Sequence, residues 1–259
     1  MADTIGQAGQ TYTAERDRVA GGREGVAAAF RLILCAHDLS PEPVSTGEDR
    51  NYWVPFDEFA RLFERIEANA AQAGIEIEIT SDDGFISDYE QLLPWLVERG
   101  LGATFFVPTA FVGRPGRLAP HHLREMRALG MRIGSHGHDH IAWSAASPHA
   151  LRNDVREGLD RLQDILGEWV RTVAPPFGSC NREVFRVLRE SGFEEIHLCR
   201  GGIARPTGLL RNRVALERRP AAVKRILRLS GGPGWRDRLH ATLHMTQARF
   251  DPRRARQAA

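Results

Sequence analysis

Residues 75–84, Ile-Glu-Ile-Glu-Ile-Thr-Ser-Asp-Asp-Gly, decide how the rest of the chain is organised. The three isoleucines alternate with polar residues, which predicts a β-strand. Asp82 and Asp83 end this strand, and Gly84 allows the backbone to turn sharply behind them. Neighbouring side chains at a strand end point in different directions, so one carboxylate can bind a metal while the other handles a proton.

Three histidines gather in residues 135–140, Ser-His-Gly-His-Asp-His. His136 and His140 are four residues apart, a spacing that places both rings on one face of a helical turn. Two imidazoles and one carboxylate are a recurring ligand set for a catalytic divalent metal with an open position for water. The two stretches together suggest a mononuclear metallohydrolase. Taken alone, the Asp-Asp-Gly also suits an ordinary turn, and the histidine spacing arises by chance in a chain with ten histidines.

Length and composition fit one globular domain: 259 residues, 42% hydrophobic and 26% charged. The apolar runs are too short to span a bilayer, so we expect no transmembrane segment. Residues 1–24 are polar and Gly-rich, with no apolar run after a basic start, so we expect no secretory signal and a cytoplasmic location. The three cysteines make an odd count, as expected where thiols stay reduced.

Positive charge is concentrated at the C-terminal end. Of the 35 Lys and Arg residues 13 lie in 211–259, against three of the 33 Asp and Glu residues. Such a segment suits phosphate groups, a membrane surface or nucleic acid, although a solvated surface explains it more simply. Because stacking aromatics are not interleaved with the basic residues, we expect no nucleic-acid partner and keep membrane-surface contact as a candidate role.

Strand and helix patterns alternate along the chain. Strands are expected at 30–36, 75–79, 103–107, 131–135, 170–173, 196–199 and 213–216, with helices at 55–73, 89–98, 120–129, 148–166 and 182–191. This alternation predicts an α/β fold of parallel strands, which both an open sheet and a closed barrel satisfy. Polar clusters follow the strands, and in a barrel those strand ends meet at one mouth.

Three motifs resemble one known family. In order and spacing, residues 80–84 (Thr-Ser-Asp-Asp-Gly), 136–140 and 175–178 (Pro-Pro-Phe-Gly) are similar to the first three motifs of the polysaccharide deacetylases, also called the NodB homology domain or carbohydrate esterase family 4. The resemblance covers roughly residues 30–218. It implies a distorted (β/α)7-type barrel of parallel strands in a single domain, which we expect at 26–220, with a flexible arm at 1–25 and a basic helical extension at 221–259.

The resemblance also implies an activity, namely metal-dependent removal of an N-acetyl group from a sugar or glycan precursor in cell-surface polysaccharide synthesis. Such an enzyme hydrolyses carbon–nitrogen bonds other than peptide bonds. A catalytically degenerate glycan-binding protein, or a metal-dependent hydrolase of another C–N bond, are the alternatives. The same ligand set accepts Zn, our first expectation, or Co, Ni or Fe.

By the same resemblance, Asp82 is the general base. Asp83, His136 and His140 are the metal ligands, whereas His138 is not a ligand. The backbone N–H of Phe177, which follows Pro176, is a candidate oxyanion donor.

The chain departs from the family pattern at three places. Ser81 replaces a Phe, and Ala174 replaces an Arg that orients the catalytic Asp, so that charge is missing or comes from elsewhere. No Leu-x-His motif follows the last strand to provide a general acid. His37 and His197 are the other candidate proton donors at the mouth.

Overall fold

Seven parallel strands close into a barrel in the order in which they occur along the chain. The structure, a computed structural model, describes residues 30–44 and 47–243. The barrel prediction is confirmed, and the open sheet is excluded because β7 pairs with β1. The predicted arm at 1–25 lies outside the described residues, as does the end of the C-terminal extension.

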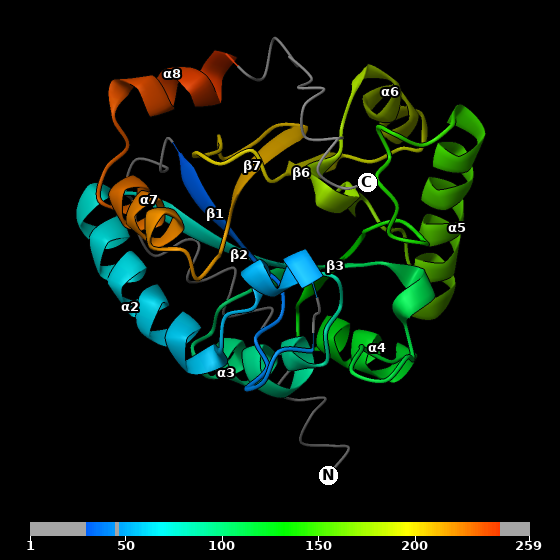
Figure 1. The fold of residues 1–259 in the computed structure, drawn as a ribbon, viewed down its shortest axis with the longest axis horizontal. Coiled ribbons are helices and arrows are strands. Elements are labelled where there is room, and N and C mark those ends of the chain that lie inside the picture. Colours follow the sequence, from blue (N-terminus) through cyan, green and yellow to red (C-terminus); the bar gives the residue numbers. More distant parts are fainter. Residues whose placement is uncertain (1–29, 45–46, 244–259) are drawn as a thin grey trace.

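The predicted strands and helices form close to their expected positions. The strands are β1 Arg31–Ala36, β2 Glu76–Asp82, β3 Ala103–Val107, β4 Arg132–Ser135, β5 Thr172–Val173, β6 Glu195–Leu198 and β7 Leu210–Ala215. The α-helices are α2 Phe56–Ala73, α3 Leu93–Glu98, α4 Pro120–Ala128, α5 Pro148–Leu166, α6 Arg182–Glu190, α7 Pro220–Ser230 and α8 Trp235–Leu243. Figure 1 shows α2 to α7 arranged around the strands.

Local sequence explains where the two longest helices begin and end. Helix α2 follows Pro55 and ends at Gly74, whose φ of 64° an L-residue adopts only at a cost. At the start of α5, the Ser147 side chain accepts a hydrogen bond from the N–H of Ala150, and the helix ends at Gly167. Both helices bury one apolar stripe against the strands, as their sequence periods predict.

The barrel interior is polar near β7. Arg211 and Arg213 are two residues apart on this strand, so their side chains point to the same side, and they are only 2% and 1% exposed. Each forms an ion pair with a carboxylate on β2, Arg211 with Glu78 and Arg213 with Asp82. Buried guanidinium groups need such partners, since an unpaired charge in the interior is very unfavourable.

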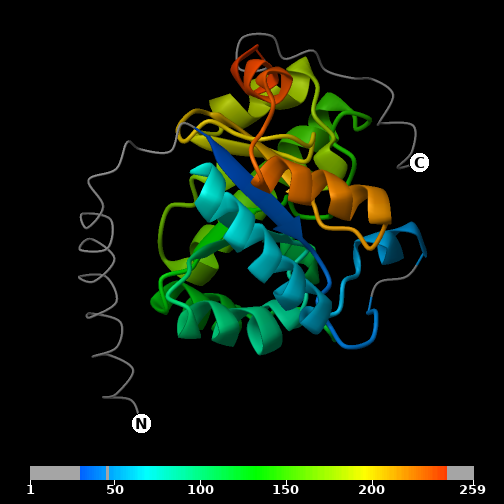
Figure 2. The same cartoon turned by 90° about the vertical axis from the view of Figure 1, so that its left-hand side faces the viewer.

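Helix α7 packs against α2, beside the seam where β7 meets β1 (Figure 2). Ile226 and Leu229 of α7 are completely buried within the chain. The predicted domain boundary at residue 220 therefore coincides with the start of a helix that packs onto the barrel. In the part of the chain that the structure describes, none of the helices combines the length and apolarity needed to cross a membrane.

Candidate active site

Asp83, His136 and His140 come together at the mouth of the barrel. One potential ligand atom from each lies within 4.8 Å of the other two. The Nε2 atoms of His136 and His140 lie 3.4 Å and 3.1 Å from Asp83 Oδ1. The sequence-predicted ligand set is thus gathered in one place.

The backbone at the end of β2 turns Asp83 away from Asp82. Asp83 has a φ of 73° and Gly84 one of 62°, so the chain changes direction immediately after the strand. Arg117 fixes this turn by donating a hydrogen bond of 2.8 Å to the Asp83 carbonyl. As a result the two neighbouring carboxylates face different partners, as the sequence predicts.

His136 follows β4 directly and is oriented by the next strand. Its Nδ1 donates a hydrogen bond of 2.6 Å to the carbonyl of Ala174, so Nε2 is the nitrogen that faces Asp83. A hydrogen bond of this kind selects the tautomer and orientation of a ligand histidine.

The expected helical turn between His136 and His140 is wrong, because residues 136–142 form a loop. Gly137 and His140 have φ values of 77° and 58°, and these reversals bring the two rings to a centroid distance of 5.0 Å. A Cβ on Gly137 would lie 2.3 Å from Asp154 Oδ2, so this position needs glycine.

Asp154 of α5 holds this loop, and sequence reasoning missed it. Its carboxylate accepts hydrogen bonds from the N–H of Asp139 at 2.6 Å and from the indole of Trp143 at 2.7 Å. The only sequence signal is an acidic residue beside the apolar stripe of a helix. His138, in the same loop, points elsewhere: its Nδ1 lies 2.8 Å from Thr109 Oγ1 and its Nε2 3.3 Å from Glu157.

The geometry of the cluster fits a divalent cation. Asp83 Oδ1 is buried, and no described residue forms a hydrogen bond with it, although two imidazoles lie beside it. An unsatisfied buried carboxylate oxygen next to two imidazole nitrogens is the environment that a bound metal satisfies. The residues present therefore match the group that the sequence predicts.

Asp82 forms a two-pronged ion pair with Arg213 of β7. The guanidinium donates to Oδ1 at 2.6 Å and to Oδ2 at 2.7 Å, and it also reaches Thr80 Oγ1 at 3.1 Å. Burial alone would raise the pKa of Asp82, but the charge and hydrogen bonds of Arg213, together with the charges of His136 and His37, outweigh it and lower this pKa to about 2. Asp82 is therefore an oriented carboxylate at neutral pH.

Comparison with known proteins agrees with this arrangement. Residues 70–196, which contain most of the site, match the family model described as polysaccharide deacetylase. The chain belongs to the polysaccharide deacetylase family. The resemblance noted in the sequence is thereby confirmed.

Several curated bacterial proteins named as deacetylases are similar to this chain. A peptidoglycan-N-acetylglucosamine deacetylase of Bacillus cereus is 30% identical over 124 residues, which cover 46% of this chain and 54% of that protein. The peptidoglycan-N-acetylglucosamine deacetylase PgdA of Listeria monocytogenes is 30% identical over 120 residues, or 46% of this chain and 25% of that protein. The chain thus spans about half the length of the curated relatives it matches, or less.

The fold of the family is also found in solved structures. IcaB from Ammonifex degensii superposes with a TM-score of 0.67 and 22% identity, over 78% of this chain and 97% of that one. The Streptococcus pyogenes deacetylase PplD gives a TM-score of 0.64 at 22% identity, over 78% and 98%. Both show the same barrel architecture.

In this chain, Arg213 provides the positive charge that the third motif lacks. Ala174 is completely buried and carries no charge where the family has an arginine. The interaction comes instead from the last strand of the barrel. Sequence reasoning left open whether the charge was missing or came from elsewhere, and the structure shows that it comes from β7.

The two candidate proton donors lie in different environments. His37 follows β1, its ring centroid is 4.8 Å from that of Tyr52, and its Nδ1 is buried with no hydrogen-bond partner among the described residues. Burial lowers the pKa of His37 from 6.5, and the charges of Asp83 and Asp82 oppose this effect.

His197 lies inside the barrel instead of at its mouth, so the expectation that placed it at the mouth is wrong. The ring is fully buried, 4.9 Å from the ring of Phe106, and its Nε2 is 3.4 Å from Glu195 at the start of β6. The side chain points inward because it alternates with Ile196 and Leu198 along the strand.

Phe177 forms one wall of the site. Its φ is 57°, its ring centroid lies 4.6 Å from that of His140, and its side chain is 45% exposed. Phe111 packs on His140 as well, with a centroid distance of 5.7 Å. Pro176, which precedes Phe177, is buried and positions this turn.

A second group of potential ligands, Cys35, Asp82 and Cys199, lies beneath the first. Cys35 Sγ is 3.4 Å from Asp82 Oδ2. Arg213 already binds both oxygens of Asp82, so a cation there would have to displace a buried guanidinium.

Proposed function

We propose that this chain is a metal-dependent hydrolase that removes an N-acetyl group from a sugar or glycan precursor in cell-surface polysaccharide synthesis. The observation that carries the proposal is the cluster of Asp83, His136 and His140 beside the ionised Asp82. Two curated relatives named as peptidoglycan-N-acetylglucosamine deacetylases support the choice of an N-acetylated sugar.

Asp83, His136 and His140 would hold a divalent metal. Such an ion, when bound, polarises a carbonyl group and lowers the pKa of water. We propose Zn, with Co, Ni or Fe as alternatives, because two imidazoles and a carboxylate accept all four and availability decides among them.

Asp82 acts as the general base in this proposal. Its Oδ2 is 3.9 Å from His136 Nε2, so a water molecule next to the histidines is within its reach. Arg213 occupies one acceptor position on each carboxylate oxygen. The second position is free on Oδ1, and on Oδ2 it is occupied only by the weak thiol donor of Cys35 at 3.4 Å, which water can displace. The ion pair with Arg213 keeps the base ionised and fixes its direction.

His37 is the proposed donor of a proton to the leaving amine. Ala36 is paired with Ser81 in the β1–β2 register, so the next residues along, His37 and Asp82, lie side by side at the mouth. Phe177 contributes its ring as a wall and its backbone N–H as the proposed donor to the developing oxyanion.

Two departures from the family pattern favour a degenerate glycan-binding protein, namely Ala174 in the third motif and the missing Leu-x-His motif. Because Arg213 provides the missing charge, only the second of these still favours that alternative. Hydrolysis of another C–N bond would use the same residues, and the substrate panel below separates it. The cytoplasmic location stays a prediction that fractionation of cells would test.

Acetate release from a panel of N-acetylated sugars and oligosaccharides, with and without a chelator, tests the proposal. We expect release that the chelator abolishes and that Asp83→Ala removes. Activity that survives both treatments would exclude the metal-dependent mechanism. If elemental analysis found no bound metal and the protein did not bind added zinc, the glycan-binding alternative would be favoured.

A further inference from the structure

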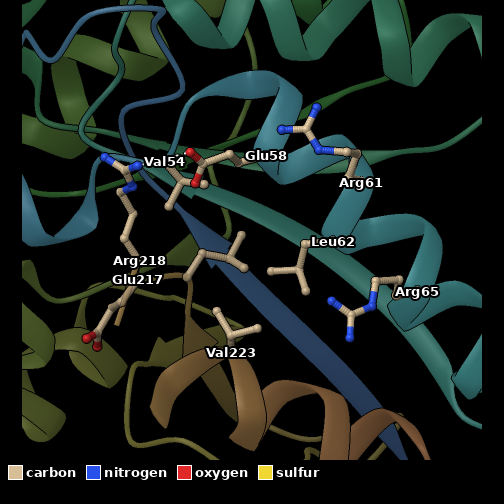
Figure 3. Close-up of a pocket in the computed structure, with 9 residues that line it drawn as sticks. Val54, Glu58, Arg61, Leu62, Arg65, Glu217, Arg218 and Val223 are labelled. Atoms are coloured by element: carbon tan, nitrogen blue, oxygen red, sulfur yellow. Dashed lines mark hydrogen bonds and ion pairs between the residues drawn. The ribbon is translucent and has the colours of Figure 1, made fainter. Parts of the chain in front are cut away.

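A groove with a volume of about 330 Å³ lies outside the barrel, between α2 and the start of α7 (Figure 3). Three segments line it: the residue before α2, one face of α2, and the turn from β7 into α7. The lining residues are Val54, Glu58, Arg61, Leu62, Arg65, Leu216, Glu217, Arg218 and Val223.

The floor of the groove is apolar. Val54 and Leu216 are buried, and Leu62 of α2 and Val223 of α7 extend this surface from the two sides (Figure 3). Water in contact with such a floor is displaced favourably by an apolar chain.

The rim carries positive charge that the protein does not neutralise. Glu58 forms an ion pair of 3.0 Å with Arg218, and Glu217 is paired with Arg219. Arg61 and Arg65 are exposed, one helical turn apart, and form no hydrogen bond or ion pair with any residue in the described part of the chain. Their guanidinium groups lie on either side of Leu62 and point in different directions (Figure 3). Both side chains are long and exposed, so each can turn its fork of N–H donors towards the oxygens of a phosphate at the rim.

The groove adjoins the candidate active site. The N–H of Val54 donates a hydrogen bond of 3.0 Å to the carbonyl of Asp38, the residue after His37. Tyr52, two residues before Val54, packs its ring on His37. A molecule bound at the mouth of the barrel can therefore extend over this short segment into the groove.

We propose that the groove binds the non-sugar part of the substrate, a phosphate group joined to an apolar chain. The phosphate contacts Arg61 and Arg65, and the chain lies on the floor between α2 and α7. This inference rests on the proposed function, and it specifies the substrate class as a sugar linked through phosphate to a lipid.

Calorimetric titration of the full chain tests the groove without any acetylated sugar. The probes are octyl phosphate, octanol and inorganic phosphate. We expect octyl phosphate to bind at least ~10-fold more tightly than either half alone, because only it uses both the floor and the rim. Equal affinity for octyl phosphate and octanol, or for octyl phosphate and inorganic phosphate, would overturn the proposal.

Two pairs of substitutions locate the binding site. Arg61→Gln with Arg65→Gln should weaken octyl phosphate roughly 10-fold, since two charge contacts near the surface are lost. The matched control is Arg156→Gln with Arg161→Gln on α5, where both arginines are exposed and have no partner among the described residues. Equal losses in the two double variants, or no loss in the first, would show that octyl phosphate binds elsewhere.

Kinetics then link the groove to the substrate. For the Arg61→Gln, Arg65→Gln variant, the KM for a lipid-phosphate-linked N-acetyl sugar should rise about 10-fold relative to the KM for a soluble N-acetyl oligosaccharide. An equal change in both KM values would contradict the inference. If the unaltered chain releases no acetate from any substrate, the proposed function fails, whereas the titration still decides whether the groove exists as a site.

Discussion

Replacing Arg213 with Met should remove the positive charge that keeps Asp82 ionised and the two hydrogen bonds that orient its carboxylate. The guanidinium is 1% exposed, donates to both oxygens of Asp82 and lies 4.9 Å from the centre of the Phe106 ring. Methionine fills much of the same volume without charge or donors. Asp82, which is 3% exposed, would then be a buried carboxylate without its counter-charge.

Two lines of reasoning give the size of the effect. Breaking a buried ion pair by removing one partner costs about 3–5 kcal/mol of unfolding free energy. The drop in the pKa of Asp82 from 3.8 to about 2 corresponds to ~2 kcal/mol by proton linkage. Because this pKa is lowered in the folded state, the contribution is present above pH 3.8 and is lost as the pH falls towards 2.

The catalytic consequence is a shift in the pH dependence. Without Arg213, burial raises the pKa of Asp82, so the carboxylate becomes protonated at higher pH. We expect the acidic limb of the kcat/KM profile for acetate release to move to higher pH, with a loss of about 100-fold at neutral pH. Arg213→Lys should be intermediate, because lysine keeps the charge but lacks the fork.

Arg211→Met is the matched control. Arg211 lies on the same strand, is 2% exposed and forms a 2.6 Å ion pair with Glu78. Denaturant unfolding should show a comparable loss of stability, while the acidic limb stays in place. If Arg213→Met and Arg211→Met gave the same pH profile, Arg213 would be a structural residue only. Adding Ala174→Arg to Arg213→Met should restore part of the activity, because it returns an arginine to the third motif.

Further predictions concern the metal ligands, the proton donor and a buried acid. Asp83→Ala should abolish binding of added zinc in a calorimetric titration, whereas His138→Ala should retain it, because that side chain points towards Thr109; retention in both variants would contradict the ligand assignment. His37→Gln should lower kcat by about 100-fold with little change in zinc affinity, and an unchanged kcat would exclude it as the donor. Burial raises the pKa of Asp88 well above 3.8, so the folded protein loses stability as the pH rises from 3.8 through the folded pKa. The Asp88→Asn variant has no such carboxyl group, so its Tm should rise relative to that of the unaltered chain between pH 4 and pH 8. A constant difference in Tm would show that Asp88 does not titrate in this range.

Much of the fold was predictable because its signals are local. The Ser147 cap, the glycines that end α2 and α5, and the period of their apolar stripes depend on residues a few positions apart. Polar residues after successive strands predicted a common mouth, since parallel strands place their ends together. These signals do not require knowledge of distant contacts.

The missed features depend on contacts between distant segments. Arg213 resembled one more basic residue in an Arg-rich end of the chain, and its role appears only when β7 pairs with β1 and faces Asp82 across the barrel. The alternation of Arg211 and Arg213 was the available signal, because residues two apart on a strand share one face. His140 was misplaced on a helical turn because spacing alone does not report a backbone reversal.

The backbone at the mouth has a consequence for protein engineering. Among the described residues, the non-glycine positions with positive φ are Asp83, His140 and Phe177, and all three border the cluster. Each such conformation costs of order 1–3 kcal/mol, which the surrounding barrel has to offset. Copying these three side chains onto another scaffold would therefore fail unless the loops that hold them were transplanted too. A designer would need to transfer the main-chain conformation of these loops together with the three side chains.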